Sequence, residues 1–191
     1  DHCNMGQSSN DTFPTVMHIA AVQKIVGETI PALGQLHAAL DAKAKAFEKI
    51  IKIGRTHLMD ATPLTLGQEF DAFAVNLGED IDRIREACAL LCEVNLGGTA
   101  IGTGINTPDG YSAKVVARLA EVSGKPLVPA CNLVEATSDM GAFVFFSGIL
   151  KRLAIKLSKM SNDLRLLSSG PRTGLGEIQL PPMQPGSSIM P

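Results

Sequence analysis

Apolar residues recur every three or four positions along three long stretches of the chain, residues 15–53, 65–94 and 135–167. This spacing lines one face of an α-helix, so each stretch predicts a long helix. Pro31 lies inside the first stretch and predicts a kink or a split there, because proline cannot continue the helical hydrogen bonds. Residues 140–150 are apolar almost all round, which is typical of a helix surrounded by other helices.

The segments between these helices are polar or rich in glycine and proline. Residues 54–70 begin between two long helical patterns, and taken alone they would be interpreted as an inter-helix turn with a surface histidine. Thr65 with Gln68 predicts a capping box at the start of the second helix. The sequence thus predicts one all-α domain over residues 1–191, a long up-down helix bundle that continues into other chains. The minor elements predicted are a turn at 106–110, a short helix at 112–122, an irregular connection at 124–132, a loop from 173 onward, and strand-like segments near 51–53 and 127–128.

Composition narrows the classes of function. Hydrophobic residues make up 45% of the 191, charged residues 19%, and the formal net charge is −2, so nothing favours electrostatic binding to nucleic acid or to a membrane. No apolar run reaches membrane-spanning length, and no signal peptide is recognisable. The glycine-rich segment 97–104 follows no strand and lacks the Lys-Ser/Thr of a phosphate-binding loop, so we interpret its glycines as points of close backbone packing.

Several titratable side chains are interpreted as structural. The cysteines lack the partners of a zinc site and predict buried free thiols in a reducing compartment, which favours a cytoplasmic location. His18 and His37 lie in helical patterns and are interpreted as packing or surface residues. Glu79 and Asp82 are interpreted as ion-pair partners of nearby arginines. The cysteines are Cys3, Cys88, Cys92 and Cys131.

Three polar stretches exceed what the helices need: QSSND at 7–11, GRTH at 54–57 and GSSIMP at 186–191. One Asp or Ser would cap the helix that follows the first stretch, whereas five consecutive polar side chains lie there. Hydroxyls and backbone N–H groups at a helix N-terminus form a cradle for a carboxylate. The first stretch therefore indicates a carboxylate-binding site.

In this order and spacing the three stretches resemble the fumarase/aspartase superfamily, and the resemblance runs along essentially the whole chain. GSSIMP is similar to the start of the specific family signature G-S-S-x-M-P-x-K-x-N, and the sequence stops before its Lys and Asn. The resemblance implies a central helix-bundle domain in a homotetramer whose active sites combine the three stretches from three subunits. It implies reversible anti elimination from a small dicarboxylate to give fumarate, with no metal or organic cofactor.

The resemblance also implies roles for residues of this chain. Ser187 is expected to be the base, as an oxyanion stabilised by neighbouring donors, on a loop that closes over the substrate. Thr56 and His57 are expected to bind a substrate carboxylate, and His57 is a candidate for proton transfer. The remaining residues expected to bind the substrate are Ser8, Ser9, Asn10 and Ser188.

Two enzymes of the superfamily remain as alternatives. LVEATSDMGAF and NDLRLLSSGPR are similar to aspartate ammonia-lyases, whereas GRTHLMDATP is at least as similar to fumarases. We favour conversion of L-aspartate to fumarate and ammonia over conversion of L-malate to fumarate and water. A non-catalytic, crystallin-like protein or an inactive core fragment is the third alternative. Because the family's N-terminal substrate-binding segment and the signature Lys and Asn are absent, the 191 residues are expected to be a piece of a longer chain and inactive alone.

Overall fold

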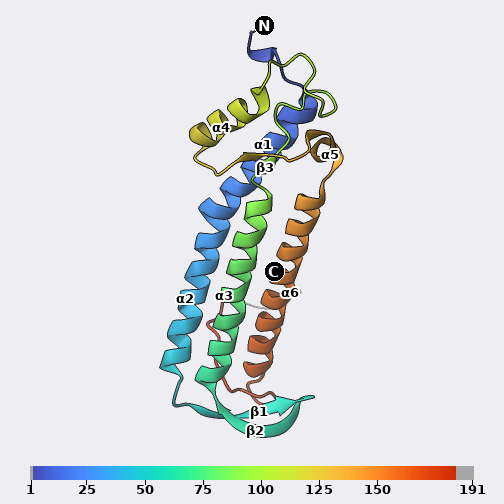
Figure 1. Ribbon diagram of the computed structural model, residues 1–191. Coiled ribbons are helices and arrows are strands. Elements are labelled where there is room, and N and C mark those ends of the chain that lie inside the picture. Colours follow the sequence, from blue (N-terminus) through green and yellow to red (C-terminus); the bar gives the residue numbers. More distant parts are fainter. Residues whose placement is uncertain (1, 184–191) are drawn as a thin grey trace. The chain divides into compact units, whose positions relative to one another are not determined.

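The fold was analysed in a computed structural model, and residues 2–183 are described, apart from the Cys3 side chain. The chain divides into two compact units, Asp1–Arg152 and Leu153–Pro191. Helices dominate, which confirms the predicted all-α helix-bundle fold (Figure 1). In chain order the elements are η1 (His2–Asn4), α1 (Ser9–Lys24), η2 (Ile25–Thr29), α2 (Ile30–Ala46), β1 (Ile51–Thr56), β2 (Met59–Thr65), α3 (Leu66–Leu90), β3 (Glu93–Val94), α4 (Tyr111–Ser123), β4 (Val128–Pro129), α5 (Leu133–Ser138) and α6 (Gly141–Leu167).

The first long helix is divided near Pro31, as predicted. η2 is a π-helical turn, in which the backbone N–H of Ile30 donates to the carbonyl of Ile25, five residues back. Pro31 has no N–H to donate, so the wider turn accommodates the missing hydrogen bond just before the proline. The helix ends at Ala46 and not at 53, because the β-branched residues that follow enter a strand.

The connection between the first two long helical stretches is a β-hairpin and not a simple inter-helix turn. β1 pairs antiparallel with β2, and Thr56 lies opposite Met59, so His57 and Leu58 alone form the turn. Both have positive φ, 52° and 64°, the combination that matches a two-residue hairpin turn to the twist of its strands. The strand-like pattern near 51–53 is therefore confirmed, and it extends further than predicted.

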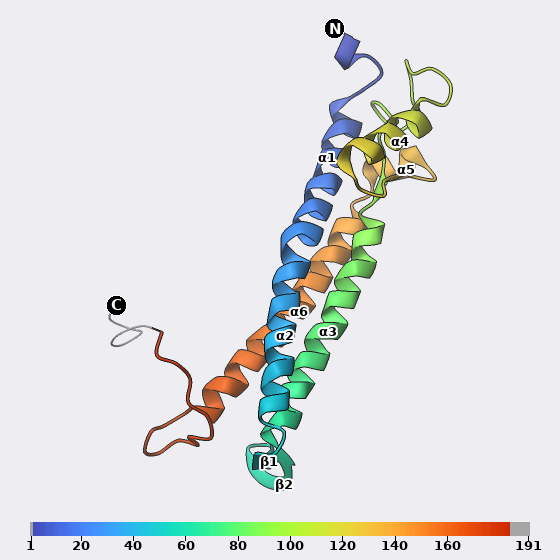
Figure 2. The same cartoon turned by 90° about the vertical axis from the view of Figure 1, so that its left-hand side faces the viewer.

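α2 and α3 form the main helix pair, and they lie side by side in two views (Figures 1 and 2). The predicted capping box starts α3: Thr65 Oγ1 accepts from the backbone N–H of Gln68, and Gln68 Oε1 accepts from that of Thr65. Gly67 allows the close approach, because a Cβ there would lie 2.5 Å from the Ala44 carbonyl oxygen. The buried side chains along the pair include Leu33, Leu40, Phe70, Phe73, Leu77, Ile81 and Ile84.

The third predicted helix, over 135–167, is two helices. α5 ends at Ser138, and Asp139 is extended, with φ −92° and ψ 136°. The Asp139 side chain then accepts from the backbone N–H of Gly141 at 2.8 Å, which starts α6. A short polar residue that bonds the following backbone competes with helix continuation, and this explains the break. The predicted helix at 112–122 is confirmed as α4, and the strand near 127–128 as β4, which pairs with β3.

The cysteine prediction is confirmed for two residues and wrong for a third. Cys88 and Cys92 are buried free thiols, and Cys131 is an exposed free thiol. Burial raises the pKa of the Cys88 and Cys92 thiols, which keeps them protonated and poorly reactive. The Cys3 side chain lies outside the described part of the structure.

The predicted ion pairs of Asp82 and Glu79 with arginines are present. Asp82 pairs with Arg85 at 3.0 Å, whereas Glu79 lies 3.7 Å from Arg152, outside its own helix. His18 is a packing residue, as predicted: its Nδ1 lies 2.9 Å from the Leu91 carbonyl oxygen and its ring packs against another aromatic side chain. Among residues 2–183, no helix has the length and apolar character needed to span a membrane.

Candidate active site

The first polar stretch forms the N-terminus of α1. Ser8 is the N-cap, with extended backbone, and its hydroxyl accepts from the backbone N–H of Asn10 at 3.2 Å. Ser9 and Asn10 follow in the first turn, and both are exposed. The Asn10 amide donates to the Ala100 carbonyl at 2.7 Å, which ties the helix start to the glycine-rich segment. These three predicted substrate-binding residues are thus neighbours on one exposed turn.

A hollow of about 510 Å³ opens beside this turn. Its lining includes Asn4, Gln7 and Ser8, together with Ala100 and Asn106 from the connection that precedes α4. Hydroxyl, amide and backbone N–H groups at a helix N-terminus suit a carboxylate ligand. The volume of the hollow suits a small molecule. Of the three predicted residues on this turn, Ser8 lines it, whereas Ser9 and Asn10 are not part of its lining.

Asp11 is a residue whose importance the sequence did not reveal. Its side chain is fully buried, and it accepts from the backbone N–H groups of Ser8 at 2.9 Å, Gly97 at 3.1 Å and Thr99 at 2.9 Å. A Ser followed three residues later by an acid is a capping-box pattern, and that signal in QSSND could have pointed to the bond with Ser8. No local pattern links Asp11 to residues almost ninety positions away.

The second polar stretch lies at the tip of the hairpin. Thr56 ends β1 and His57 begins the turn, and both side chains are exposed. A bulge between Ile53 and Arg55 interrupts the pairing at Gly54, where a Cβ would lie 2.7 Å from the Thr62 carbonyl oxygen. The glycine therefore sets the bend of the strand that presents Thr56 and His57.

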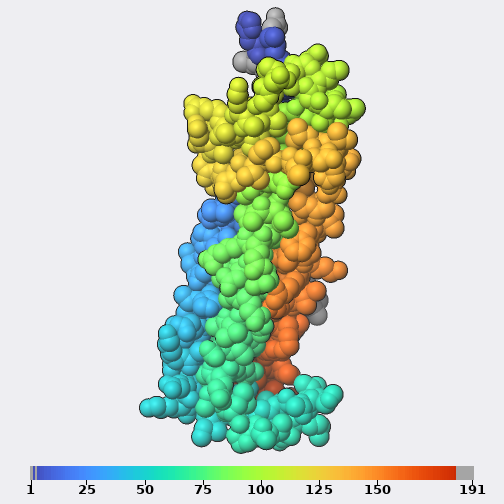
Figure 3. Space-filling model, viewed as in Figure 1, coloured from blue at the N-terminus to red at the C-terminus, as the bar shows by residue number. Residues whose placement is uncertain are grey.

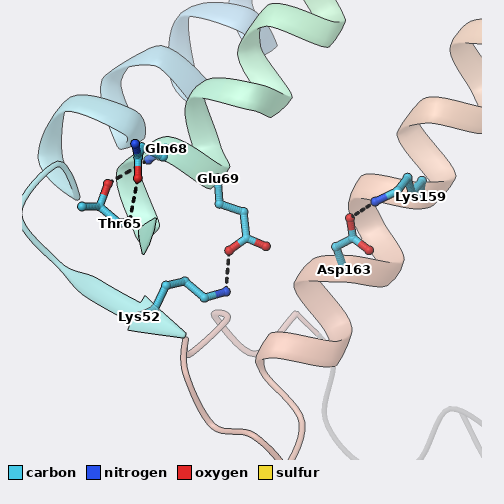
Figure 4. Close-up of polar contacts among 6 residues, drawn as sticks. All are labelled: Lys52, Thr65, Gln68, Glu69, Lys159 and Asp163. Atoms are coloured by element: carbon cyan, nitrogen blue, oxygen red, sulfur yellow. Dashed lines mark hydrogen bonds and ion pairs between the residues drawn. The ribbon is translucent and has the colours of Figure 1, made fainter. Parts of the chain in front are cut away.

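An ion pair joins the hairpin to the helices. Lys52 on β1 lies 2.5 Å from Glu69 on α3, and only 9% of the Lys52 side chain is exposed (Figure 4). The same view shows the reciprocal capping bonds of Thr65 and Gln68, and the exposed pair of Lys159 and Asp163 within α6. A charged pair this shielded from water fixes the orientation of the strand more firmly than a surface pair does.

One copy of the chain does not bring these two groups together. The hairpin adjoins the first turn of α3, whereas the N-terminal end of α1 lies beyond the other end of α3 (Figure 1). In the space-filling view the hairpin segment and the N-terminal segment lie at opposite ends (Figure 3). The 25 residues of α3 span about 37 Å at 1.5 Å per residue. A single small substrate cannot contact both groups of one copy. Ser187 and Ser188, the predicted third group, lie outside the described residues.

No group of three or more His, Cys, Asp or Glu side chains in the described part of the chain is arranged to hold a metal ion. The chemistry that the two groups offer is hydrogen bonding by hydroxyls, amides and backbone N–H groups, together with one exposed imidazole.

Comparison with known proteins decides the family. A lyase family model matches residues 1–191. The chain belongs to the fumarase/aspartase superfamily. It is 62% identical over 190 residues to the aspartate ammonia-lyase of Pseudomonas aeruginosa, with 98% of the chain and 40% of the relative covered. It is 54% identical to the class II fumarate hydratase of Mesorhizobium japonicum, with 100% of the chain and 41% of the relative covered.

Solved structures of the superfamily share the fold. A fumarate lyase:delta crystallin from Brucella melitensis, bound to cobalt, matches with a TM-score of 0.91 and 58% identity, over 98% of this chain and 41% of that one. The class II fumarase of Schistosoma mansoni matches with a TM-score of 0.91 and 37% identity, over 100% of this chain and 43% of that one. The chain thus spans about two fifths of the length of its relatives.

Proposed function

We propose that the full-length protein containing this chain converts L-aspartate reversibly to fumarate and ammonia. The observation that carries the proposal is the 62% identity to an aspartate ammonia-lyase along nearly the whole chain. The hollow beside Ser8 is also lined by the amide side chains of Asn4, Gln7 and Asn106, and such polar groups support a substrate that carries carboxylates.

The proposed reaction needs a base, carboxylate binding and a leaving group. Ser187, as an oxyanion, takes a proton from the carbon next to one carboxylate, and that carboxylate holds the resulting charge. The electron pair then forms the carbon–carbon double bond while the bond to nitrogen breaks and ammonia leaves. Thr56 and His57 bind a carboxylate, and His57 is the candidate for proton transfer. The other substrate-binding residues proposed are Ser8, Ser9, Asn10 and Ser188.

The site is proposed to form between copies of the protein. The hairpin and the start of α1 lie at opposite ends of α3, a helix that is itself about 37 Å long, and this separation supports a site built from different subunits. Exposed apolar side chains on α6, among them Val144 and Phe145, support burial of that helix against other copies. A homotetramer with shared active sites satisfies both observations. The free thiols of Cys88, Cys92 and Cys131 support a cytoplasmic location.

Fumarate hydratase activity is the second candidate. The 54% identity to a class II fumarate hydratase over the whole chain favours it, because the two reactions differ only in the leaving group. A structural role is the third candidate, and the likeness to a fumarate lyase:delta crystallin supports it. The exposed hydroxyl of Thr56 and imidazole of His57 at the hairpin tip favour an enzyme over the structural role, since both groups can take part in substrate binding or proton transfer.

The test is fumarate formation by the purified full-length protein, followed by ultraviolet absorbance with L-aspartate and L-malate supplied separately. Fumarate from aspartate alone supports the proposal, and fumarate from malate alone replaces it with the hydratase. No fumarate from either substrate, with a folded protein, favours the structural role. The isolated 191 residues are expected to be inactive, because they lack the family's N-terminal substrate-binding segment and the signature Lys and Asn, and measurable lyase activity in them would contradict that expectation.

A further inference from the structure

The polar turn at the start of α1 is held in place by buried side chains that do not themselves face the hollow. Asp11 is fully buried and bonds the backbone of Ser8 on its own helix and of Gly97 and Thr99 on the glycine-rich segment. One carboxylate therefore joins two segments that are 86 to 88 residues apart in the sequence. Bonds from three N–H groups to one buried carboxylate are strong and directional.

A second buried side chain holds the same turn from the other side. Asn95 is 2% exposed, and its amide nitrogen donates to the Asn10 carbonyl at 3.0 Å and to the Thr137 hydroxyl at 3.1 Å. Both hydrogens of that amide group are used, so Asn95 links α1 to α5. Asn10 in turn donates to Ala100. Hydrogen bonds with Asp11, Asn95 and Ala100 therefore hold the exposed turn that carries Ser8, Ser9 and Asn10.

Backbone strain accompanies these contacts. Thr99 has a φ of 57°, a conformation that a β-branched residue adopts only when its surroundings impose it. In that conformation its N–H points at the Asp11 carboxylate. Gly97 has a φ of 95°, and a Cβ there would lie 2.6 Å from Ser112 Cβ. Strain of this kind persists where a fixed geometry serves function.

We propose that Asp11 and Asn95 are positioning residues for the lyase reaction: they hold Ser8, Ser9 and Asn10 in the geometry that binds the dicarboxylate. The inference rests on the proposed function. Neither residue contacts the substrate; both act through the backbone of the turn. Loss of either set of bonds allows the turn to move, and substrate binding weakens because several hydrogen bonds are misplaced together.

The test uses Asp11→Asn and Asn95→Ala in the full-length protein. Asp11→Asn keeps the shape of the side chain but turns an NH₂ group toward backbone N–H donors. Asp80→Asn is the matched control, because Asp80 is equally buried, on α3, and pairs with Arg152 at 3.0 Å. We expect KM for the substrate and the inhibition constant of succinate, a dicarboxylate without a leaving group, to rise about tenfold in the first two variants.

The proposal is decided by whether each variant changes KM and the succinate inhibition constant, or changes Tm alone. Asp80→Asn is expected to lower Tm while KM and the succinate constant stay unchanged. If Asp11→Asn and Asn95→Ala also lower Tm without raising either constant, their role is structural and the proposal is wrong. If Asp11→Asn does not fold, Asn95→Ala decides alone. A wild-type protein that forms no fumarate from either substrate refutes the proposed function, and the positioning role falls with it.

Discussion

His57 occupies a backbone conformation that few side chains adopt, at the tip of an exposed hairpin. Its φ of 52° lies in the left-handed region, which costs an ordinary residue roughly 1 kcal/mol or more. Asn tolerates that region better than most residues, so His57→Asn removes the imidazole and keeps the turn. We expect kcat/KM of the full-length protein to fall by about 100-fold or more, as for a lost acid–base group, with Tm unchanged.

The matched control for that prediction is His37→Asn, which removes a half-buried imidazole from the middle of α2. Steady-state kinetics and thermal unfolding of both variants give the comparison. Equal activity of His57→Asn and the wild type would contradict the role proposed for His57.

His18 predicts a pH dependence of stability. Burial lowers its pKa below the ordinary 6.5, and the bonded carbonyl of Leu91 and the charge of Glu93 offset this only in part. The unfolded chain therefore binds a proton near pH 6 that the folded chain does not, and stability falls as the pH drops below 6.5. We expect His18→Gln to lose less stability than the wild type between pH 7.5 and 5.5, measured by urea unfolding. An identical pH dependence would refute this account.

At the scale of elements, two glycines with positive φ are expected to differ in how much stability is lost when each is replaced by alanine. Gly102 has a φ of 93°, and a Cβ there would lie 2.3 Å from Val134 Cα, whereas Gly110 has a φ of 73° and open space around it. We expect Gly110→Ala to lower the free energy of unfolding by about 1 kcal/mol, from the left-handed conformation alone. Gly102→Ala should cost about 2–4 kcal/mol, because overpacking adds to it. Equal costs in denaturant unfolding would contradict the close approach to α5.

The elements also show what apolar spacing can and cannot predict. The long stripes of α2, α3 and α6 were predictable, because a core-facing side needs the same residue type every three or four positions. The hairpin was not, since its turn uses His57 and Leu58 where a turn of this kind usually has Asn and Gly. The break before α6 was also missed, because Asp139 competes through a side-chain bond that apolar spacing does not register.

On the scale of the whole molecule, exposed apolar side chains on α6 predict assembly. Val144 on α6 is 71% exposed and Val122 on α4 is 72% exposed, so Val122 is a suitable control for a substitution of Val144. We expect Val144→Asp to shift the full-length protein from a tetramer to smaller species in light scattering, because a charge is costly in an apolar interface. Val122→Asp should leave the mass unchanged. Tetramers that persist in Val144→Asp would place the interface elsewhere.

The sequence predicted the candidate substrate-binding residues, but it did not predict the buried residues that hold them in place. Ser8, Ser9 and Asn10 were predicted because their stretch holds more polar residues than a helix cap requires. Thr56 and His57 were predicted from the GRTH stretch. The residues that hold them were not marked, because Asp11 and Asn95 act through contacts more than eighty positions away. Long-range hydrogen bonds leave no periodic trace in a single sequence.

The most direct test of a site shared between subunits mixes two inactive full-length variants, His57→Asn and Ser187→Ala. If different subunits supply the two residues, random mixed tetramers should regain about a quarter of wild-type activity, since half the subunits are competent at each position. Fumarate formation from the preferred substrate measures the recovery, and two affinity tags isolate the mixed tetramers. Mixed tetramers as inactive as either parent would show that His57 and Ser187 act within one chain, and the account would be wrong.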